Sequence, residues 1–215
     1  MPGREPALAV NFKPLPQSFY QPGAELVAPR LLGHWLIRNT PQGPAGGPIV
    51  ETEAYLMGDP ACHGFIGQTR RNAALYGPPG RAYVYLIYGL HFCFNAVCRP
   101  EGQAEAVLVR AIEAQFGANF MRAHRNAPDP RHLTNGPAKL CAALDINRGL
   151  DGVDLCDSNS PVFIAKNPAH KPFLRERGPM VVTTRIGITQ AAERPLRFYL
   201  EGSQDVSRRI KQKSQ

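Results

Sequence analysis

The stretch from Gly80 to Val97 constrains the fold of this chain most strongly. It is rich in aromatic and β-branched residues, a composition that favours two strands over a helix. We predict a strand over Ala82–Ile87, a tight turn at Tyr88 and Gly89, and a strand over Leu90–Val97, because glycine tolerates positive φ. The Tyr88 ring would then face solvent at the hairpin tip. The alternative, which this stretch alone favours, is a core hairpin whose tip tyrosine folds back onto its own strands.

Length and charge limit the organisation of the chain. The 215 residues contain no repeat and no long linker, so we expect one mixed domain over 1–215, with an irregular arm at 1–17. Residues 207–215 form a basic tail that is either disordered or touches phosphates. The net charge is +8, and the arginines heavily outnumber the lysines. This balance suits a polyanionic partner, nucleic acid above all, although many basic proteins bind none.

The cysteines and histidines do not indicate a bound metal or cofactor. The five cysteines are odd in number and form no CxxC pair, and the six histidines form no HExxH or HxH pattern. Thiols of this kind are typical of a reducing cytoplasm. No apolar run reaches the roughly 20 residues of a membrane helix, so we expect no membrane partner.

Two carboxylates and a tyrosine alternate along a predicted strand at Ile49–Tyr55. In an extended segment, Glu51, Glu53 and Tyr55 share one face. The common explanation for such a pattern is a solvated face with both acids in water. The alternative is that one carboxylate lines a pocket as a general base.

Two further segments carry candidate charged sites. Arg110 lies in a nearly continuous apolar strand at Ala104–Glu113, where a cation needs a carboxylate or a ligand phosphate as its partner, and a structural salt bridge is the default. A helix that starts at Asn135 or Gly136 would present free N–H groups and Lys139 to an anion. Simple capping explains this second pattern equally well.

The remaining elements follow from local patterns and turn residues. We predict helices at Pro22–Leu32, Thr69–Tyr76 and Glu113–Arg125 and a Gly/Pro turn at Pro41–Pro48. The other predicted strands are His34–Arg38, Val162–Ala165, Met180–Ile188 and Leu196–Leu200.

Motifs that keep their order from about residue 15 to residue 207 resemble the alkyladenine (3-methyladenine, methylpurine) DNA glycosylases, and the short chain resembles a bacterial member. The most specific is Glu-Thr-Glu-Ala-Tyr followed by Tyr-Val-Tyr-Leu-Ile-Tyr-Gly. The matching segments are Val50–Leu56, His63, Thr69–Asn72, Tyr83–Gly89, Phe92–Asn95, Val107–Glu113, Asn135–Leu140 and Pro195–Tyr199.

The resemblance implies an α+β domain with a curved antiparallel sheet and a hairpin that enters the DNA minor groove. Tyr88 would intercalate where the damaged nucleotide is flipped out. Glu53 would activate the attacking water, and Arg110 would help to position that water or the nearby backbone. The base pocket would be built from Tyr55, His63, Tyr85 and Asn95, and the backbone contacts with DNA would include Thr69, Arg71 and Lys139.

The implied activity is a monofunctional DNA glycosylase of base excision repair. It would remove 3-methyladenine, 7-methylguanine, ethenoadenine or hypoxanthine from duplex DNA through an oxocarbenium-like transition state. The nearest lysines to the pocket motifs are Lys13 and Lys139, so a Schiff-base lyase step is not expected. The enzyme would work as a monomer at the bacterial nucleoid, without a metal or another cofactor.

The hairpin allows a geometric test of this resemblance. With a strict two-residue turn, Tyr85 faces the same side as Phe92, and Asn95 lies on the opposite face. For Tyr85 and Asn95 to share one pocket, the turn must hold an odd number of residues, or a bulge must lie beside Gly89. We predict such an irregularity.

Some positions depart from the family pattern, and other functions stay open. Gly67, His91 and Gln204-Asp205 replace residues that are more usual there, which affects the expected DNA contacts and substrate range. A core role for His63 stays open, and we assign Glu51 to a structural or supporting role. One alternative function is a non-catalytic DNA-binding β module. Another is a hydrolase of small nucleosides or sugars that uses Glu51 and Glu53 as an acid pair.

Overall fold

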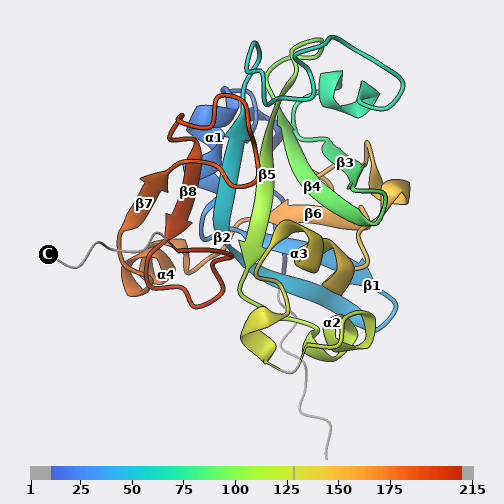
Figure 1. Ribbon diagram of the computed structural model, residues 1–215. Helices are drawn as coiled ribbons and strands as arrows, with labels where there is room; N and C mark the ends of the chain where they lie inside the picture. Colours follow the sequence, from blue (N-terminus) through green and yellow to red (C-terminus); the bar gives the residue numbers. More distant parts are fainter. Residues whose placement is uncertain (1–10, 128, 210–215) are drawn as a thin grey trace, which may run out of the picture.

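The computed structural model describes residues 11–127 and 129–209, and it shows an α+β fold built around a curved antiparallel sheet (Figure 1). The strands run in the order β3-β4-β5-β2-β1-β6. In addition, β8 pairs with β2 on one side and with β7 on the other. The predicted fold class is therefore confirmed. The strands are β1 (Trp35–Thr40), β2 (Gly43–Tyr55), β3 (Ala82–Ile87), β4 (His91–Cys98), β5 (Glu105–Ile112), β6 (Val162–Ala165), β7 (Met180–Thr183) and β8 (Arg197–Leu200).

The long strand β2 connects the two parts of the sheet. Its first half pairs with β1, and its second half lies between β5 and β8. The turn predicted at Pro41–Pro48 is confirmed only at Pro41 and Gln42, which connect Thr40 to Gly43, and the rest of this Gly/Pro segment belongs to β2. Its glycines permit close backbone packing: a Cβ on Gly46 would lie 1.9 Å from the Leu36 carbonyl oxygen, and one on Gly47 would lie 1.9 Å from the Glu113 carbonyl oxygen.

Helices cover one face of the sheet, and the charged side chains of Glu51, Glu53 and Arg110 lie on the other face. Helices α1 and α3 contact β2, β4 and β5. The face under them is fully buried and apolar, with Val84, Phe94, Val107 and Val109 in the main core. The helices are α1 (Ala24–Leu31), α2 (Ala118–His124), α3 (Pro137–Ala143) and α4 (His170–Glu176), with short 3₁₀ turns η1 (Gln17–Phe19), η2 (Ala73–Tyr76), η3 (Pro130–His132) and η4 (Arg148–Leu150).

The β3–β4 hairpin has the predicted irregular turn. Ile87 pairs with His91, so three residues rather than two connect the strands. Tyr83 and Tyr85 consequently face the same side as Asn95, which is the arrangement that a shared pocket requires. Gly89 has φ +69°, as expected for the turn. Tyr88 is 85% exposed, so the folded-back alternative is wrong.

Several predicted boundaries are wrong for local physical reasons. The helix predicted at Glu113–Arg125 begins only at Ala118, because Gly117 takes a left-handed conformation with φ +63°. The helix predicted at Thr69–Tyr76 is reduced to η2. The helix predicted at Pro22–Leu32 begins only at Ala24 and continues past Pro29 to Leu31. Helix α4 was not predicted at all.

The described part of the N-terminal arm packs against the sheet. The Phe12 ring contacts the Trp35 ring edge-on with centroids 5.5 Å apart, and Pro14 bridges to Ala165. Residues 1–10 of the predicted arm and 210–215 of the predicted tail lie outside the described residues. Within the described part of the chain, no helix has the length and apolarity needed to cross a membrane.

Candidate active site

An irregular pairing between β2 and β5 places charged side chains on the face away from the helices. Glu51 pairs with Ala111, but Thr52 pairs with Val109, so Arg110 has no direct partner in the register. Such a bulge re-aims a side chain. Arg110 points toward Glu51 and Glu53, both fully buried. The partner of Arg110 is therefore a pair of protein carboxylates, as expected for a structural salt bridge.

Glu53 is held by three donors from three parts of the chain. Its Oε2 accepts a hydrogen bond of 2.9 Å from the Tyr55 hydroxyl and lies 3.1 Å from Arg110 Nη1. Its Oε1 accepts a bond of 2.8 Å from the Ile186 amide, in the segment after β7. In all three contacts the carboxylate oxygens face N–H or O–H donors.

Glu51 has a different environment, in which its contacts are structural. Its Oε1 lies 3.0 Å from Arg110 Nε and 2.6 Å from Arg197 Nε, and it accepts a bond of 2.9 Å from the Ser207 hydroxyl. The Ser207 amide donates to Oε2 at 2.7 Å. The solvated-face interpretation is thus wrong for both acids. Because Glu51 and Glu53 share Arg110, they also do not flank a substrate as an acid pair would.

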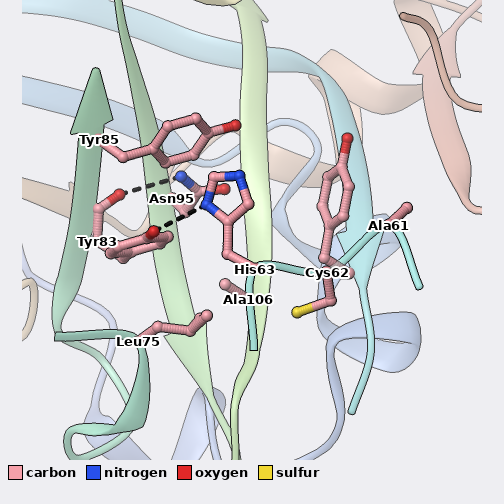
Figure 2. A pocket seen from close by; sticks show the side chains of 9 residues that line it. Ala61, Cys62, His63, Leu75, Tyr83, Tyr85, Asn95 and Ala106 are labelled. Carbon is pink, nitrogen blue, oxygen red and sulfur yellow. Dashed lines mark hydrogen bonds between the residues drawn. The ribbon is translucent and has the colours of Figure 1, made fainter. Parts of the chain in front are cut away.

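An aromatic pocket opens beside Tyr55, and Figure 2 shows the Tyr83 and Tyr85 rings directed toward His63. The His63 and Tyr85 rings meet edge-on with centroids 4.3 Å apart, and His63 Nδ1 lies 2.8 Å from the Tyr83 hydroxyl. Asn95 Nδ2 donates to the Tyr83 carbonyl at 3.0 Å. The pocket is lined by Tyr55, Ala61, Cys62, His63, Leu75, Tyr83, Tyr85, Asn95 and Ala106.

The structure thus brings together all four side chains expected in the base pocket and adds others. Tyr83 was missed, although its period-2 spacing from Tyr85 was a usable signal. The sequence did not indicate that the small side chains of Ala61 and Ala106 line the pocket, because only the topology brings these segments together.

A rigid loop presents His63 at the edge of the pocket. Asn72 Nδ2 donates to the carbonyls of His63 at 2.9 Å and Gly67 at 3.0 Å, and Asn72 Oδ1 accepts from the Thr69 amide at 2.6 Å. His63 is exposed, so the core-histidine alternative is wrong. Burial of one side of its ring, together with the charge of Arg71, lowers the pKa of His63 below its ordinary value.

The tyrosines of the pocket are neutral phenols. Burial raises the pKa of Tyr55 far above its ordinary value, and the charge of Glu53 adds to this effect. Burial likewise raises the pKa of Tyr83 and Tyr85. The pocket therefore offers uncharged π surfaces, and the Glu53 side chain contacts it through the Tyr55 hydroxyl.

A buried arginine supports Tyr55 from outside the pocket. Arg185 Nη1 lies 2.5 Å from Asp59 Oδ2 and donates to the Ala54 carbonyl at 3.0 Å. Its guanidinium lies 4.8 Å from the centroid of the Tyr55 ring. It also directly precedes Ile186, whose amide contacts Glu53. Sequence reasoning missed Arg185, although a lone arginine in the apolar stretch Met180–Ile188 was the same signal that identified Arg110.

The three expected DNA-backbone residues lie outside the pocket. Thr69 and Arg71 are exposed on the segment that follows the His63 loop. Lys139 is half-buried on α3, where its Nζ donates to Asn135 Oδ1 at 2.9 Å. Burial and the charge of Arg125 lower the pKa of Lys139. Among the described residues, no three His, Cys, Asp or Glu side chains are grouped so that they could hold a metal ion.

Comparison with known proteins identifies the family. The family model for methylpurine-DNA glycosylase matches residues 18–204. A relative from Methanoculleus marisnigri is 50% identical over 195 residues, covering 91% of this chain and 99% of the relative. One from Carboxydothermus hydrogenoformans is 44% identical over the same shares of both chains. Both are named "Putative 3-methyladenine DNA glycosylase". The chain therefore belongs to the methylpurine-DNA glycosylase family, DNA-repair hydrolases that cleave N-glycosyl bonds.

Proposed function

We propose that this chain is a monofunctional glycosylase that flips alkylated or deaminated purines out of duplex DNA and hydrolyses their N-glycosidic bond in base excision repair. Its proposed substrates are 3-methyladenine, 7-methylguanine, ethenoadenine and hypoxanthine. The observation that carries the proposal is the position of Glu53, a buried carboxylate bonded to the Tyr55 hydroxyl at 2.9 Å beside an aromatic pocket.

Glu53 is the proposed general base. It would accept a proton from a water that attacks C1′ of the deoxyribose while the base departs through an oxocarbenium-like transition state. The Ile186 amide and the Tyr55 hydroxyl fix one carboxylate oxygen each. Arg110 fixes the carboxylate further, so that Glu53 requires no reorganisation before it acts.

The pocket suits a flat and often cationic purine. The rings of Tyr55, His63 and Tyr85 supply faces and edges for stacking, and cationic bases such as 3-methyladenine and 7-methylguanine gain cation–π attraction. The lowered pKa of His63 keeps its ring neutral, which avoids repulsion of a cationic base. A cationic base leaves readily, so one carboxylate suffices for these substrates.

Tyr88 is the proposed wedge in the duplex. Its ring is 85% exposed at the tip of the hairpin that also carries Tyr85, three residues earlier. A ring in this position would stack in the gap that the flipped nucleotide leaves and so offset the loss of base stacking. Duplex DNA is the proposed partner, bound by a monomer at the nucleoid in the cytoplasm.

The absence of a suitable amine supports the monofunctional assignment. The residues that line the pocket include no lysine, and Lys139 already contacts Asn135 on α3. A Schiff base with C1′ requires a nearby amine nucleophile. A non-catalytic DNA-binding module remains the alternative, but it does not explain why a carboxylate is buried beside an aromatic pocket.

Base release tests the proposal. Duplex oligonucleotides that each carry one of the four damaged purines are incubated with the enzyme, and an undamaged duplex serves as the control. We expect free base and an intact abasic strand, with no covalent enzyme–DNA adduct after borohydride treatment. Tight binding without any base release would instead support the binding module, and a trapped adduct would contradict the monofunctional assignment.

A further inference from the structure

A second cavity, rich in arginine, lies beside Glu51 and Glu53. It has a volume of about 550 Å³ and is lined by the segment after β7, by β8 and by the C-terminal segment. Its polar side chains include Thr183, Thr184, Arg197, Arg208 and Arg209. The aromatic pocket and this cavity share no lining residue. The proposed base-release mechanism assigns no role to this cavity.

Each cavity has one lining residue that contacts Glu53, and the two residues contact different oxygens of its carboxylate. Tyr55, in the wall of the aromatic pocket, bonds Oε2, and Ile186, in the wall of the arginine-rich cavity, bonds Oε1 at 2.8 Å. A nucleotide has the order base, sugar, phosphate. If the base occupied the aromatic pocket and C1′ lay at Glu53, a neighbouring phosphate would be directed toward the side of the arginine-rich cavity.

Two of the four arginines in this cavity have no carboxylate partner among the described residues. Arg185 is paired with Asp59, and Arg197 is paired with Glu51. Arg208 and Arg209 are exposed, and neither forms an ion pair with a carboxylate of residues 11–127 or 129–209. A guanidinium has five N–H donors and binds phosphate oxygens through two of them at once. The cavity therefore has a local positive surplus suited to a phosphodiester.

The segment that carries these arginines is fixed to the catalytic centre. The Ser207 amide and hydroxyl bond Glu51 at 2.7 and 2.9 Å. Arg197 Nη2 donates to the Arg208 carbonyl, and Arg209 Nη2 donates to the Ser203 carbonyl. One carboxylate, Glu51, thus holds both Arg110 and the residue before Arg208. An anion bound here would meet a pre-positioned site.

We propose that this cavity binds a phosphodiester group next to the flipped nucleotide, with Arg208 and Arg209 as its ligands. The proposal rests on the proposed function, because it takes C1′ to lie at Glu53. The site recognises the charge of the DNA backbone and not the base, so it strengthens binding equally for every damaged purine.

The test combines a protein change with a DNA change. The double variant Arg208→Ala/Arg209→Ala is compared with Arg122→Ala/Lys166→Ala, which removes two exposed charges on α2 and after β6. Both are measured on lesion duplexes that carry a neutral methylphosphonate, in turn, at the phosphate 5′ or 3′ of the damaged nucleotide. Melting temperatures check that both variants fold.

Coupling between the two changes is the expected result. At one of the two phosphate positions, the neutral linkage should weaken DNA binding by the wild-type protein and by the control variant. At that same position, it should not change DNA binding by the Arg208→Ala/Arg209→Ala variant. The slope of log K against log salt should fall by about 0.9 in that variant, since both arginines bind one phosphate and each neutralised phosphate contributes about 0.9. Additive losses at both positions, or a slope equal to that of the control, would overturn the proposal.

Base release by the wild-type protein separates this inference from the proposed function. If the wild type releases base but the variant and the neutral linkage are not coupled, only the phosphate site is wrong. If the wild type releases no base from any lesion, the proposed function is wrong, and coupling in the binding assay then shows a phosphate site in a DNA-binding protein without glycosylase activity.

Discussion

Arg110 Nη1 lies 3.1 Å from Glu53 Oε2, and both side chains are buried. The same guanidinium reaches Glu51 through Nε at 3.0 Å, because a bulge in β5 frees it from the regular register. One arginine therefore connects the proposed general base to the carboxylate that anchors the C-terminal segment. We therefore expect changes at Arg110 to affect both stability and activity.

Replacement of Arg110 should destabilise the fold strongly. Arg110→Ala leaves two buried carboxylates with fewer partners, which typically costs about 3–5 kcal/mol of unfolding free energy. Arg131→Ala removes an exposed arginine that pairs with Asp129, and it should leave the unfolding free energy unchanged. Urea denaturation of both variants checks the contrast. Equal stability of Arg110→Ala and the wild type would show that the buried network is not required.

The hydroxyl of Tyr55 should contribute to catalysis independently of its ring. Tyr55→Phe keeps the pocket wall but removes the 2.9 Å bond to Glu53. Base release under single-turnover conditions should slow about 10- to 150-fold, because a hydrogen bond to a charged group contributes about 1.5–3 kcal/mol.

Tyr83→Phe is the matched control for that change. It removes the hydroxyl that contacts His63 Nδ1 at 2.8 Å and leaves Glu53 untouched, so its effect on the chemical step should be much smaller. If the two variants slow base release equally, the hydroxyl of Tyr55 has no specific role at Glu53.

Tyr88 should matter for DNA and not for folding. Its side chain is 85% exposed, so Tyr88→Ala should change the unfolding free energy by less than about 0.5 kcal/mol. Affinity for a lesion duplex should fall about 5- to 150-fold, since stacking of a base on an aromatic ring contributes about 1–3 kcal/mol. Leu26→Ala, which truncates a 63% exposed side chain on α1, should bind DNA as the wild type does. Unchanged affinity of Tyr88→Ala for the lesion duplex would contradict the assignment of Tyr88 as the wedge.

Acid should destabilise the protein through His34. Burial, with the nearby His170, Lys166 and Arg30, lowers the pKa of His34 to about 3. Above about pH 6.5 the ring is neutral in both states, and below about pH 3 it is charged in both. Between these values only the unfolded state binds the proton, so stability falls as pH falls.

This histidine should contribute a slope of about 1.4 kcal/mol per pH unit. His34→Asn removes the titrating ring, and the difference between its pH–stability curve and that of the wild type isolates the contribution. Parallel curves between pH 6 and pH 3 would show that His34 does not stay neutral in the folded protein.

The local parts of the fold could be predicted from the sequence. Alternation placed Glu51, Glu53 and Tyr55 on one face, and the requirement that Tyr85 and Asn95 share a pocket predicted the odd-numbered turn that the structure has. These inferences succeeded because strand geometry has period 2 and fixes relative orientation without knowledge of distant contacts.

The long-range parts could not be predicted in the same way. The contact between Glu51 and Ser207 joins residues 156 apart in sequence, and that between Glu53 and Ile186 joins residues 133 apart. Neither partner carries a recognisable motif, and in the second case only a backbone amide is involved. The turn predicted at Pro41–Pro48 was too long for another reason: Gly46 and Gly47 serve close strand packing and not a turn.

Base release by Glu53→Gln tests the central claim most directly. The amide keeps the shape of the side chain and an acceptor for the Ile186 amide but removes the general base. Single-turnover release from a methylpurine duplex should fall about 10²- to 10⁴-fold while DNA affinity is retained. Glu113→Gln, at a carboxylate that pairs with Arg177, should release base at the wild-type rate. Release by Glu53→Gln at the wild-type rate would contradict the assignment of Glu53 as the catalytic base.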